Sequence, residues 1–144
     1  MLREIGREMR IPSMTQVPVQ QRNILIVDDD AAVRNSLKFS LEAEGYRVRA
    51  YATPNELLNE PSLPDQSCLI VNYNMPPMNG LEFVARLRDR HVSIPVILAT
   101  GHLSDNIRRR AATAGVFTIE KPFLGNRLFD CVERAFEQGA KAPG

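Results

Sequence analysis

Residues 24–30 read Ile-Leu-Ile-Val-Asp-Asp-Asp, four aliphatic side chains followed directly by three acids. A continuous apolar run of this length is typical of a strand buried on both faces of a parallel sheet. The acids supply helix N-capping oxygens, and apolar residues then recur with helical spacing at Val33, Leu37 and Leu41. Gly45 follows as expected for the residue just past a helix. The stretch therefore predicts a central strand that leads into a helix, with carboxylates at the carboxyl end of the strand.

The same alternation of strand and helix continues along the chain. Further strands are expected at 46–51, 68–71, 96–99 and 117–120, and further helices at 55–59, from Gly80 to His91, from Ser104 to Ala114, and from Leu124 to Ala135. Connections of this length suit right-handed crossovers between parallel strands. We predict an α/β fold, a (βα)5 doubly wound parallel five-stranded sheet of the flavodoxin-like type with strand order 2-1-3-4-5. The alternating segment 46–51 belongs at an edge because only one of its faces is apolar.

Length and composition indicate one globular domain with a short extension at each end. Of the 144 residues, 44% are hydrophobic and 24% charged, and the net charge of +1 gives no global field to recruit nucleic acid or membrane. Cys68 and Cys131 lie in apolar patterns, as expected for reduced core residues of a cytoplasmic protein. We expect a disordered or flexible extension at 1–21, the folded domain at 22–138 and a flexible tail at 139–144.

Polar residues stand where four of the predicted strands end. Asp28 and Asp29 follow the first strand, Asn72 the third, Thr100 the fourth and Lys121 the fifth. In a doubly wound sheet the site lies beyond the carboxyl ends of the strands, at the switch point between strands 1 and 3. Adjacent carboxylates repel unless a cation lies between them, and Mg²⁺ prefers hard oxygen ligands. The pattern indicates a metal-assisted phosphoryl-acceptor pocket in which Asn72 stands where the chemistry calls for a carboxylate.

Four segments of the chain resemble the receiver domain of response regulators, the CheY-like family of two-component signal transduction. They are residues 24–29 (Ile-Leu-Ile-Val-Asp-Asp), 75–80 (Met-Pro-Pro-Met-Asn-Gly), 100–101 (Thr-Gly) and 121–123 (Lys-Pro-Phe), and the resemblance spans residues 23–137. The segments are specific because they occur together, in the family's order and spacing.

The resemblance implies a set of roles for the residues at the strand ends. Magnesium would be held by Asp28, Asp29, the side chain at position 72 and the backbone carbonyl of Asn74. Thr100 and Lys121 would sense the phosphoryl group carried by residue 72. The resemblance also implies a cis peptide bond between Lys121 and Pro122.

The chain departs from the family pattern at two positions. The phosphoacceptor aspartate of the family falls at position 72, which is asparagine here. An amide has no anionic oxygen with which to attack phosphorus, so we expect the fold to persist, phosphorylation to fail and Mg²⁺ to bind more weakly. The aromatic switch residue of the family falls at Thr118, and whether Phe117 or Thr118 takes its place stays open.

The function implied is that of a single-domain receiver in a phosphorelay, not an enzyme. With aspartate at position 72, it would accept phosphate from a sensor histidine kinase or a histidine phosphotransfer protein. The signal would pass to a downstream protein through the face formed by the fourth helix, the fifth strand and the last helix. We expect a cytoplasmic phosphoprotein without direct nucleic-acid or membrane contacts; a homodimer, the cognate kinase and the output target stay open.

Other interpretations of the same residues stay open at this point. The amide at position 72 can belong to a natural pseudo-receiver that acts by protein binding only, or it can be an engineered substitution. A haloacid-dehalogenase-like phosphatase would use Asp28 as nucleophile and Asp30 as acid/base, although the late acidic motif of that family is missing. An adaptor that never binds metal is a third reading. His102 near the pocket mouth has no assigned role, and residues 108–110, all arginine, suit a partner-docking patch.

Overall fold

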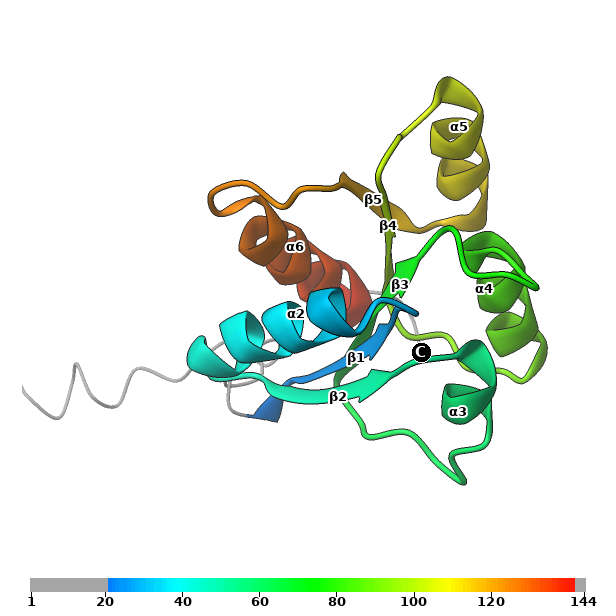
Figure 1. Ribbon diagram of the computed structural model, residues 1–144. Helices are drawn as coiled ribbons and strands as arrows, with labels where there is room; N and C mark the ends of the chain where they lie inside the picture. Colours follow the sequence, from blue (N-terminus) through cyan, green and yellow to red (C-terminus); the bar gives the residue numbers. More distant parts are fainter. Residues whose placement is uncertain (1–20, 142–144) are drawn as a thin grey trace, which may run out of the picture.

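A computed structural model of the protein describes residues 21–141, in which a five-stranded parallel sheet carries helices on both faces (Figure 1). The strands are β1 (Asn23–Val27), β2 (Arg47–Tyr51), β3 (Ser67–Asn72), β4 (Val96–Thr100) and β5 (Phe117–Glu120). Their order in the sheet is β2-β1-β3-β4-β5, and every neighbouring pair is parallel. The predicted fold class and strand order are confirmed.

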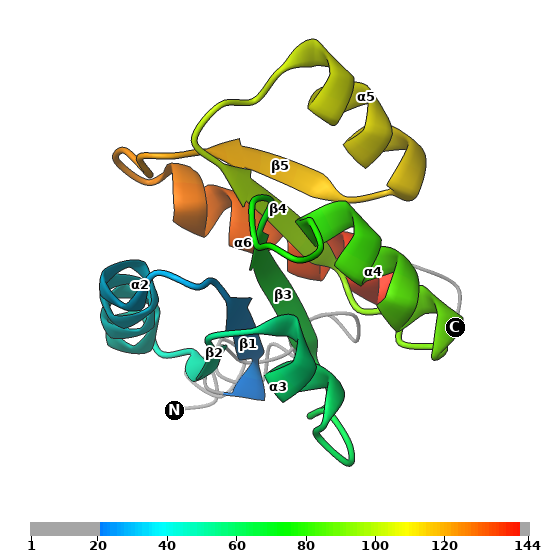
Figure 2. The same cartoon turned by 45° about the vertical axis from the view of Figure 1, so that its right-hand side comes forward.

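The helices divide into two layers, one on each face of the sheet (Figure 2). They are α2 (Ala31–Ala43), α3 (Pro54–Leu58), α4 (Gly80–Asp89), α5 (Asp105–Ala114) and α6 (Arg127–Lys141). One core cluster joins Ile24 and Ile26 of β1 to α2 and α6, and a second joins Leu25 and Val27 to α3, α4 and α5. Because successive side chains of a strand point to opposite faces, a strand covered on both sides must be apolar throughout. This explains the uninterrupted aliphatic run in β1.

Local hydrogen bonds explain where several helices begin and end. Asp30 caps α2, since its carboxylate accepts from the backbone N–H groups of Ala32 and Val33. Asn79 and Glu82 form a reciprocal capping box at α4, and the Ser104 hydroxyl caps α5. These side chains satisfy backbone donors that have no partner within the first helical turn.

The last helix differs from the prediction at both ends. Leu124 was expected on its buried face, but the helix begins at Arg127 and Leu124 is 59% exposed. Gly125 has a φ of +59°, so the backbone turns between the two positions. The helix runs on to Lys141, into the range 139–144 assigned to a flexible tail. The predicted N-terminal extension lies, apart from Gln21, outside the described residues.

Two further expectations can be compared with the structure. Lys121-Pro122 is a cis peptide as predicted, and Pro76-Pro77 is a second cis peptide that the sequence did not suggest. Cys68 and Cys131 are both free and buried, in agreement with their interpretation as core residues. None of the helices in the described range is long and apolar enough to cross a membrane.

Candidate functional site at the carboxyl edge of the sheet

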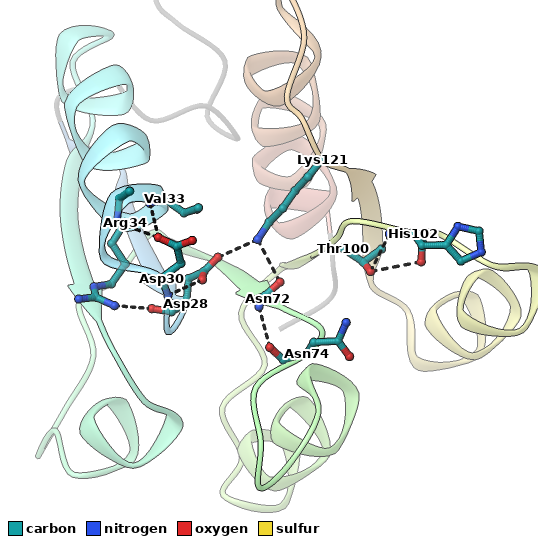
Figure 3. A network of polar contacts seen from close by, with 10 residues as sticks. Asp28, Asp30, Val33, Arg34, Asn72, Asn74, Thr100, His102 and Lys121 are labelled. Atoms are coloured by element: carbon teal, nitrogen blue, oxygen red, sulfur yellow. Dashed lines mark hydrogen bonds and ion pairs between the residues drawn. The ribbon is translucent and has the colours of Figure 1, made fainter.

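The register of the sheet places the candidate site residues beside one another (Figure 3). Val27 of β1 is paired with Val71 of β3, so the residues that follow them, Asp28 and Asn72, lie on neighbouring strands. Thr100 at the end of β4 is paired with Glu120, which immediately precedes Lys121. Residues from four parts of the chain therefore gather at one edge of the sheet, as the predicted topology required.

The ammonium group of Lys121 contacts the side chains of both Asp28 and Asn72. Its Nζ lies 3.0 Å from Oδ2 of Asp28 and 3.1 Å from Oδ1 of Asn72. The Asp28 side chain is only 4% exposed and the Lys121 side chain 24%. A carboxylate this deeply buried needs a charged or hydrogen-bonding partner to offset its lost hydration. The lysine supplies that partner across 93 residues of sequence.

The amide of Asn72 makes two different hydrogen bonds. Its Oδ1 accepts from Lys121, while its Nδ2 donates to the backbone carbonyl of Asn74 at 2.8 Å. The reverse orientation would set an NH₂ group against an ammonium and an oxygen against a carbonyl, so this orientation is the only one that satisfies both contacts. A carboxylate at position 72 could make the first of these contacts and could not donate in the second.

The three consecutive acids after β1 have three different environments. Asp28 points into the site, with Oδ1 accepting from the backbone N–H of Asp30 at 2.9 Å and Oδ2 bound to Lys121. Asp30 caps α2 and is therefore turned to the helix. Asp29 is exposed, and no hydrogen bond or salt bridge to its side chain occurs within residues 21–141. The structure thus brings Asp28 into the site and leaves Asp29 at its margin.

The donors at this edge suit a hard divalent cation in chemical type. The carboxylates of Asp28 and Asp29, the amide oxygen of Asn72 and the backbone carbonyl of Asn74 are all oxygen ligands of the kind Mg²⁺ takes. Several are already engaged, because Lys121 holds two of the side chains and the Asn74 carbonyl accepts from Asn72. No cluster of three or more acids, histidines or cysteines with metal-binding geometry is present in the described part of the chain.

Thr100 lies at the site edge without joining the Lys121 network. The residue is buried, and within residues 21–141 its Oγ1 bonds only to the backbone of His102, accepting from the N–H and donating to the carbonyl. The His102 imidazole is exposed and points away from Asp28 and Asn72 (Figure 3). The roles predicted for Thr100 and for Lys121 toward a phosphoryl group stay predictions.

The two candidates for the aromatic switch lie in different surroundings. Phe117 packs against the core cluster between the sheet and α6, so its ring belongs to the interior. Thr118 lines a cavity between α5 and α6 at the outer edge of β5. Neither position carries an aromatic ring at that outer edge.

Two arginines make contacts at the site margin that were not predicted from the sequence, although Arg110 was assigned with residues 108–109 to a partner-docking patch. Arg34 Nη1 donates to the backbone carbonyl of Asp28 at 2.7 Å, and Arg110 Nη1 donates to the hydroxyl of Tyr73 at 3.2 Å. Arg34 stands one turn after the cap residue Asp30, a spacing that could have indicated a contact back to the strand end. Nothing in the local sequence indicated the second contact, which joins α5 to the loop after β3.

Comparison with known proteins agrees with this geometry. Residues 24–133 match the model of the response regulator receiver domain, which is most of the chain. The chain belongs to the response regulator receiver domain family. Receivers of this family are modules of two-component response regulators, and the sheet order and the strand-end acids described above are consistent with membership.

Individual relatives of this receiver come from several bacteria. It is 32% identical over 123 residues to the transcriptional regulatory protein FixJ of Bradyrhizobium diazoefficiens, covering 83% of this chain and 59% of that protein. It is 36% identical over 108 residues to the C4-dicarboxylate transport transcriptional regulatory protein DctR of Rhodobacter capsulatus, covering 73% and 55%. The chain thus spans about half the length of these curated relatives.

Solved receiver structures superpose closely on the protein. The crystal structure of FixJ-N aligns with a TM-score of 0.74 at 33% identity, over 81% of this chain and 94% of that chain. The chemotaxis protein CheY4 of Vibrio cholerae aligns with a TM-score of 0.72 at 26% identity, over 79% and 98%.

Proposed function

We propose that this receiver is a cytoplasmic signalling module that binds its partners without accepting a phosphoryl group. The proposal rests on the amide at position 72, whose oxygen is held by Lys121 while its nitrogen is held by the Asn74 carbonyl. In a receiver the residue at this position must attack phosphorus, and a neutral amide has no anionic oxygen for that attack. The protein acts in this view as a pseudo-receiver and not as a catalyst.

The same residues would become a phosphoryl-acceptor site if position 72 carried aspartate. Lys121 already lies within hydrogen-bond distance of this side chain, so its ammonium could stabilise negative charge on an incoming phosphoryl group. Thr100 lies buried at the adjacent strand end and could donate its hydroxyl to a phosphoryl oxygen. The donor would be a sensor histidine kinase or a histidine phosphotransfer protein.

Magnesium would be held by Asp28 and Asp29 with the side chain at position 72 and the Asn74 carbonyl. When bound, Mg²⁺ would neutralise charge on the phosphoryl oxygens and orient them. We expect weaker binding here than in a receiver with aspartate, for two reasons. The pocket has one negative charge fewer, and the amide of Asn72 donates to the very carbonyl that would otherwise face the cation.

The partner-binding part of the proposal concerns the face made by α5, β5 and α6. In a phosphorylated receiver this face would pass the signal to a downstream protein. An unphosphorylated chain keeps the same surface residues, so it would still bind kinases and targets that recognise the resting form. The target and the oligomeric state are left to experiment.

The experiment that tests the proposal is reversion of position 72. We expect Asn72→Asp to incorporate a hydroxylamine-sensitive acyl phosphate from acetyl phosphate and MgCl₂, followed by intact-mass spectrometry, while the unaltered chain stays unlabelled. Equal labelling of the unaltered chain would show that residue 72 is not the acceptor. Asp30→Asn in the Asn72→Asp background is the matched control, because Asp30 only caps α2 and asparagine also caps.

The same control separates the receiver from the phosphatase alternative. A haloacid-dehalogenase-like enzyme would need Asp30 as its acid/base, yet this carboxylate accepts hydrogen bonds from Ala32 and Val33 and is turned away from Lys121. We expect no turnover of p-nitrophenyl phosphate by the unaltered chain. Turnover that disappears in both Asp28→Asn and Asp30→Asn would favour the phosphatase.

A further inference from the structure

A cavity of about 260 Å³ opens beside β5, and neither Asp28 nor Asn72 is among its lining residues. It lies between α5 and α6, which flank the strand in both ribbon views (Figures 1 and 2). β5 is the last strand of the sheet and, within residues 21–141, is hydrogen-bonded on one side only, to β4. The cavity therefore adjoins an open sheet edge, where backbone N–H and C=O groups are free to bind another chain. Thr118 leaves room there because its side chain is short.

Three arginines dominate the lining of this cavity. Arg108 comes from α5, and Arg127 and Arg134 come from α6. Within residues 21–141, no hydrogen bond or salt bridge joins their guanidinium groups to a protein acceptor. A planar guanidinium presents paired donors that match a carboxylate, so unpaired arginines around a cavity favour an anionic occupant.

Two acids share the lining and do not cancel this preference. Glu120 is already engaged, since its Oε2 accepts from the backbone N–H of Leu103 at 3.1 Å. Asp130 is the other acid, so three positive groups face two negative ones and the lining keeps one positive charge in excess. Arg109, next in sequence to Arg108, adds a further exposed positive charge on α5.

The size of the cavity limits what can enter it. Pockets for drug-sized ligands are roughly 300–1,000 Å³, so this one is below the range that would enclose a nucleotide. It has room for a single acidic side chain. The open edge of β5 beside it can add a strand, as in recognition of extended peptides by sheet edges.

We propose that the cavity receives the carboxylate of a glutamate or aspartate from an extended acidic segment of a partner protein laid along β5. The proposal deepens the proposed function, since it names the chemistry of the partner at the α5, β5 and α6 face. The tests of the cavity involve no phosphorylation, so a negative result would not bear on the role proposed for Asn72. Conversely, labelling of the unaltered chain by acetyl phosphate would not bear on the cavity.

Cys131 provides a built-in probe, because it is among the residues that line the cavity. The test compares the rates at which an anionic reagent (sulfonatoethyl methanethiosulfonate) and a cationic reagent (trimethylammonioethyl methanethiosulfonate) modify this residue in the folded full chain. Burial raises the pKa of the Cys131 thiol, but both reagents need the same thiolate, so the rate ratio is independent of that shift. Cys68, fully buried, is the internal control in the mass spectrum.

We expect the anionic-to-cationic rate ratio to exceed that of N-acetylcysteine amide by roughly tenfold at low ionic strength and to fall with added salt. Arg108→Gln combined with Arg134→Gln should bring the ratio back toward that of the free thiol. Arg47→Gln combined with Arg86→Gln makes the same change in net charge at exposed residues outside the cavity and should leave the ratio near its original value. The proposal is overturned if the unaltered chain shows the same rate ratio as N-acetylcysteine amide, or if Cys131 reacts with neither reagent.

A second measurement identifies the source of the carboxylate. The capped peptide Ala-Glu-Val-Glu-Val-Glu-Ala, titrated into the isotope-labelled full chain, should shift the amide resonances of residues 117–120, and its glutamine counterpart should not. Equal shifts from free glutarate at the same carboxylate concentration would show a small-anion site instead of a peptide site. Sedimentation equilibrium tests whether the occupant is a second copy of this chain. If the unaltered chain is a dimer and the Arg108→Gln, Arg134→Gln variant is a monomer, the occupant is this chain and not a partner protein.

Discussion

At the scale of a single residue, the amide of Asn72 determines which hydrogen bonds form at the end of β3. Its amide both accepts from Lys121 and donates to the Asn74 carbonyl, so both polar atoms of this side chain have protein partners. The place of Asn72 at the end of β3 was predictable from the sequence. The hydrogen bond to Asn74 was not, because it depends on how the loop after β3 turns back over the strand end.

Tyr46 supports a second prediction at this scale. It is buried, stacks on Phe136 with ring centroids 6.1 Å apart, and its hydroxyl lies 3.2 Å from Oε2 of Glu133. Burial, and then the Glu133 carboxylate, raise the pKa of Tyr46 from 10.0 to about 12. A raised folded-state pKa contributes stability that is complete below pH 10 and is lost as the pH rises toward 12.

We therefore expect the free-energy difference between the unaltered chain and Tyr46→Phe to shrink from pH 9 to pH 12. Below pH 10 the variant should be less stable by about 1 kcal/mol, the usual contribution of a hydrogen bond. Urea unfolding at a series of pH values measures both quantities. A constant difference across the range would mean that the tyrosine ionises as readily in the folded chain as in the unfolded chain.

The start of α4 illustrates what an element demands of a single position. A helix opening near Gly80 was predicted, and Asn79 with Glu82 explains the opening. The need for glycine itself appears only in the fold, because a Cβ at position 80 would lie 2.7 Å from the backbone oxygen of Asn72 and 2.7 Å from Cδ1 of Leu98. The helix can approach β3 and β4 this closely only without a side chain.

Gly80→Ala should accordingly destabilise the protein by about 1–3 kcal/mol, the usual cost of overpacking. Gly101→Ala is the matched control, since a Cβ there meets nothing within 4 Å, and we expect a change of about 0.5 kcal/mol or less. Denaturant unfolding of both variants gives the comparison. Similar losses at the two positions would contradict the close approach of α4 to β3.

Prediction of the elements succeeded where burial alone decides and was wrong where a turn decides. Strands β1, β3 and β4 are covered on both faces, and their unbroken apolar runs signal this directly. Leu124 has the spacing of a buried helical position relative to Leu128, but the positive φ of Gly125 separates it from the helix. The spacing of hydrophobic residues does not show where a residue adopts a positive φ and thereby interrupts the helix.

At the scale of the whole molecule, the melting temperature reports whether a ligand binds to the folded chain. A cation that binds only the folded chain raises its melting temperature, by an amount that grows with the logarithm of the cation concentration divided by its dissociation constant. We expect 10 mM MgCl₂, roughly the range in which weak sites fill, to shift the melting temperature of Asn72→Asp clearly and that of the unaltered chain little or not at all. Differential scanning fluorimetry against KCl of equal ionic strength measures the shift.

Asp29→Ala in the Asn72→Asp background controls for non-specific effects of magnesium. Asp29 is exposed and has no structural contact within the described residues, so its removal should reduce the magnesium response without altering the melting temperature in KCl. An unchanged magnesium response in this variant would remove Asp29 from the proposed ligands. A shift of equal size in the unaltered chain would show that the amide does not weaken the site.

The pairing of Val27 with Val71 has one more consequence. The span between Asp28 and residue 72 is set by main-chain hydrogen bonds between two interior strands, so exchange of acid for amide alters the charge of the site and leaves its dimensions alone. Under the proposed function, such a chain would act as a decoy that binds a kinase in competition with a reactive counterpart, in proportion to its abundance, and consumes no phosphate.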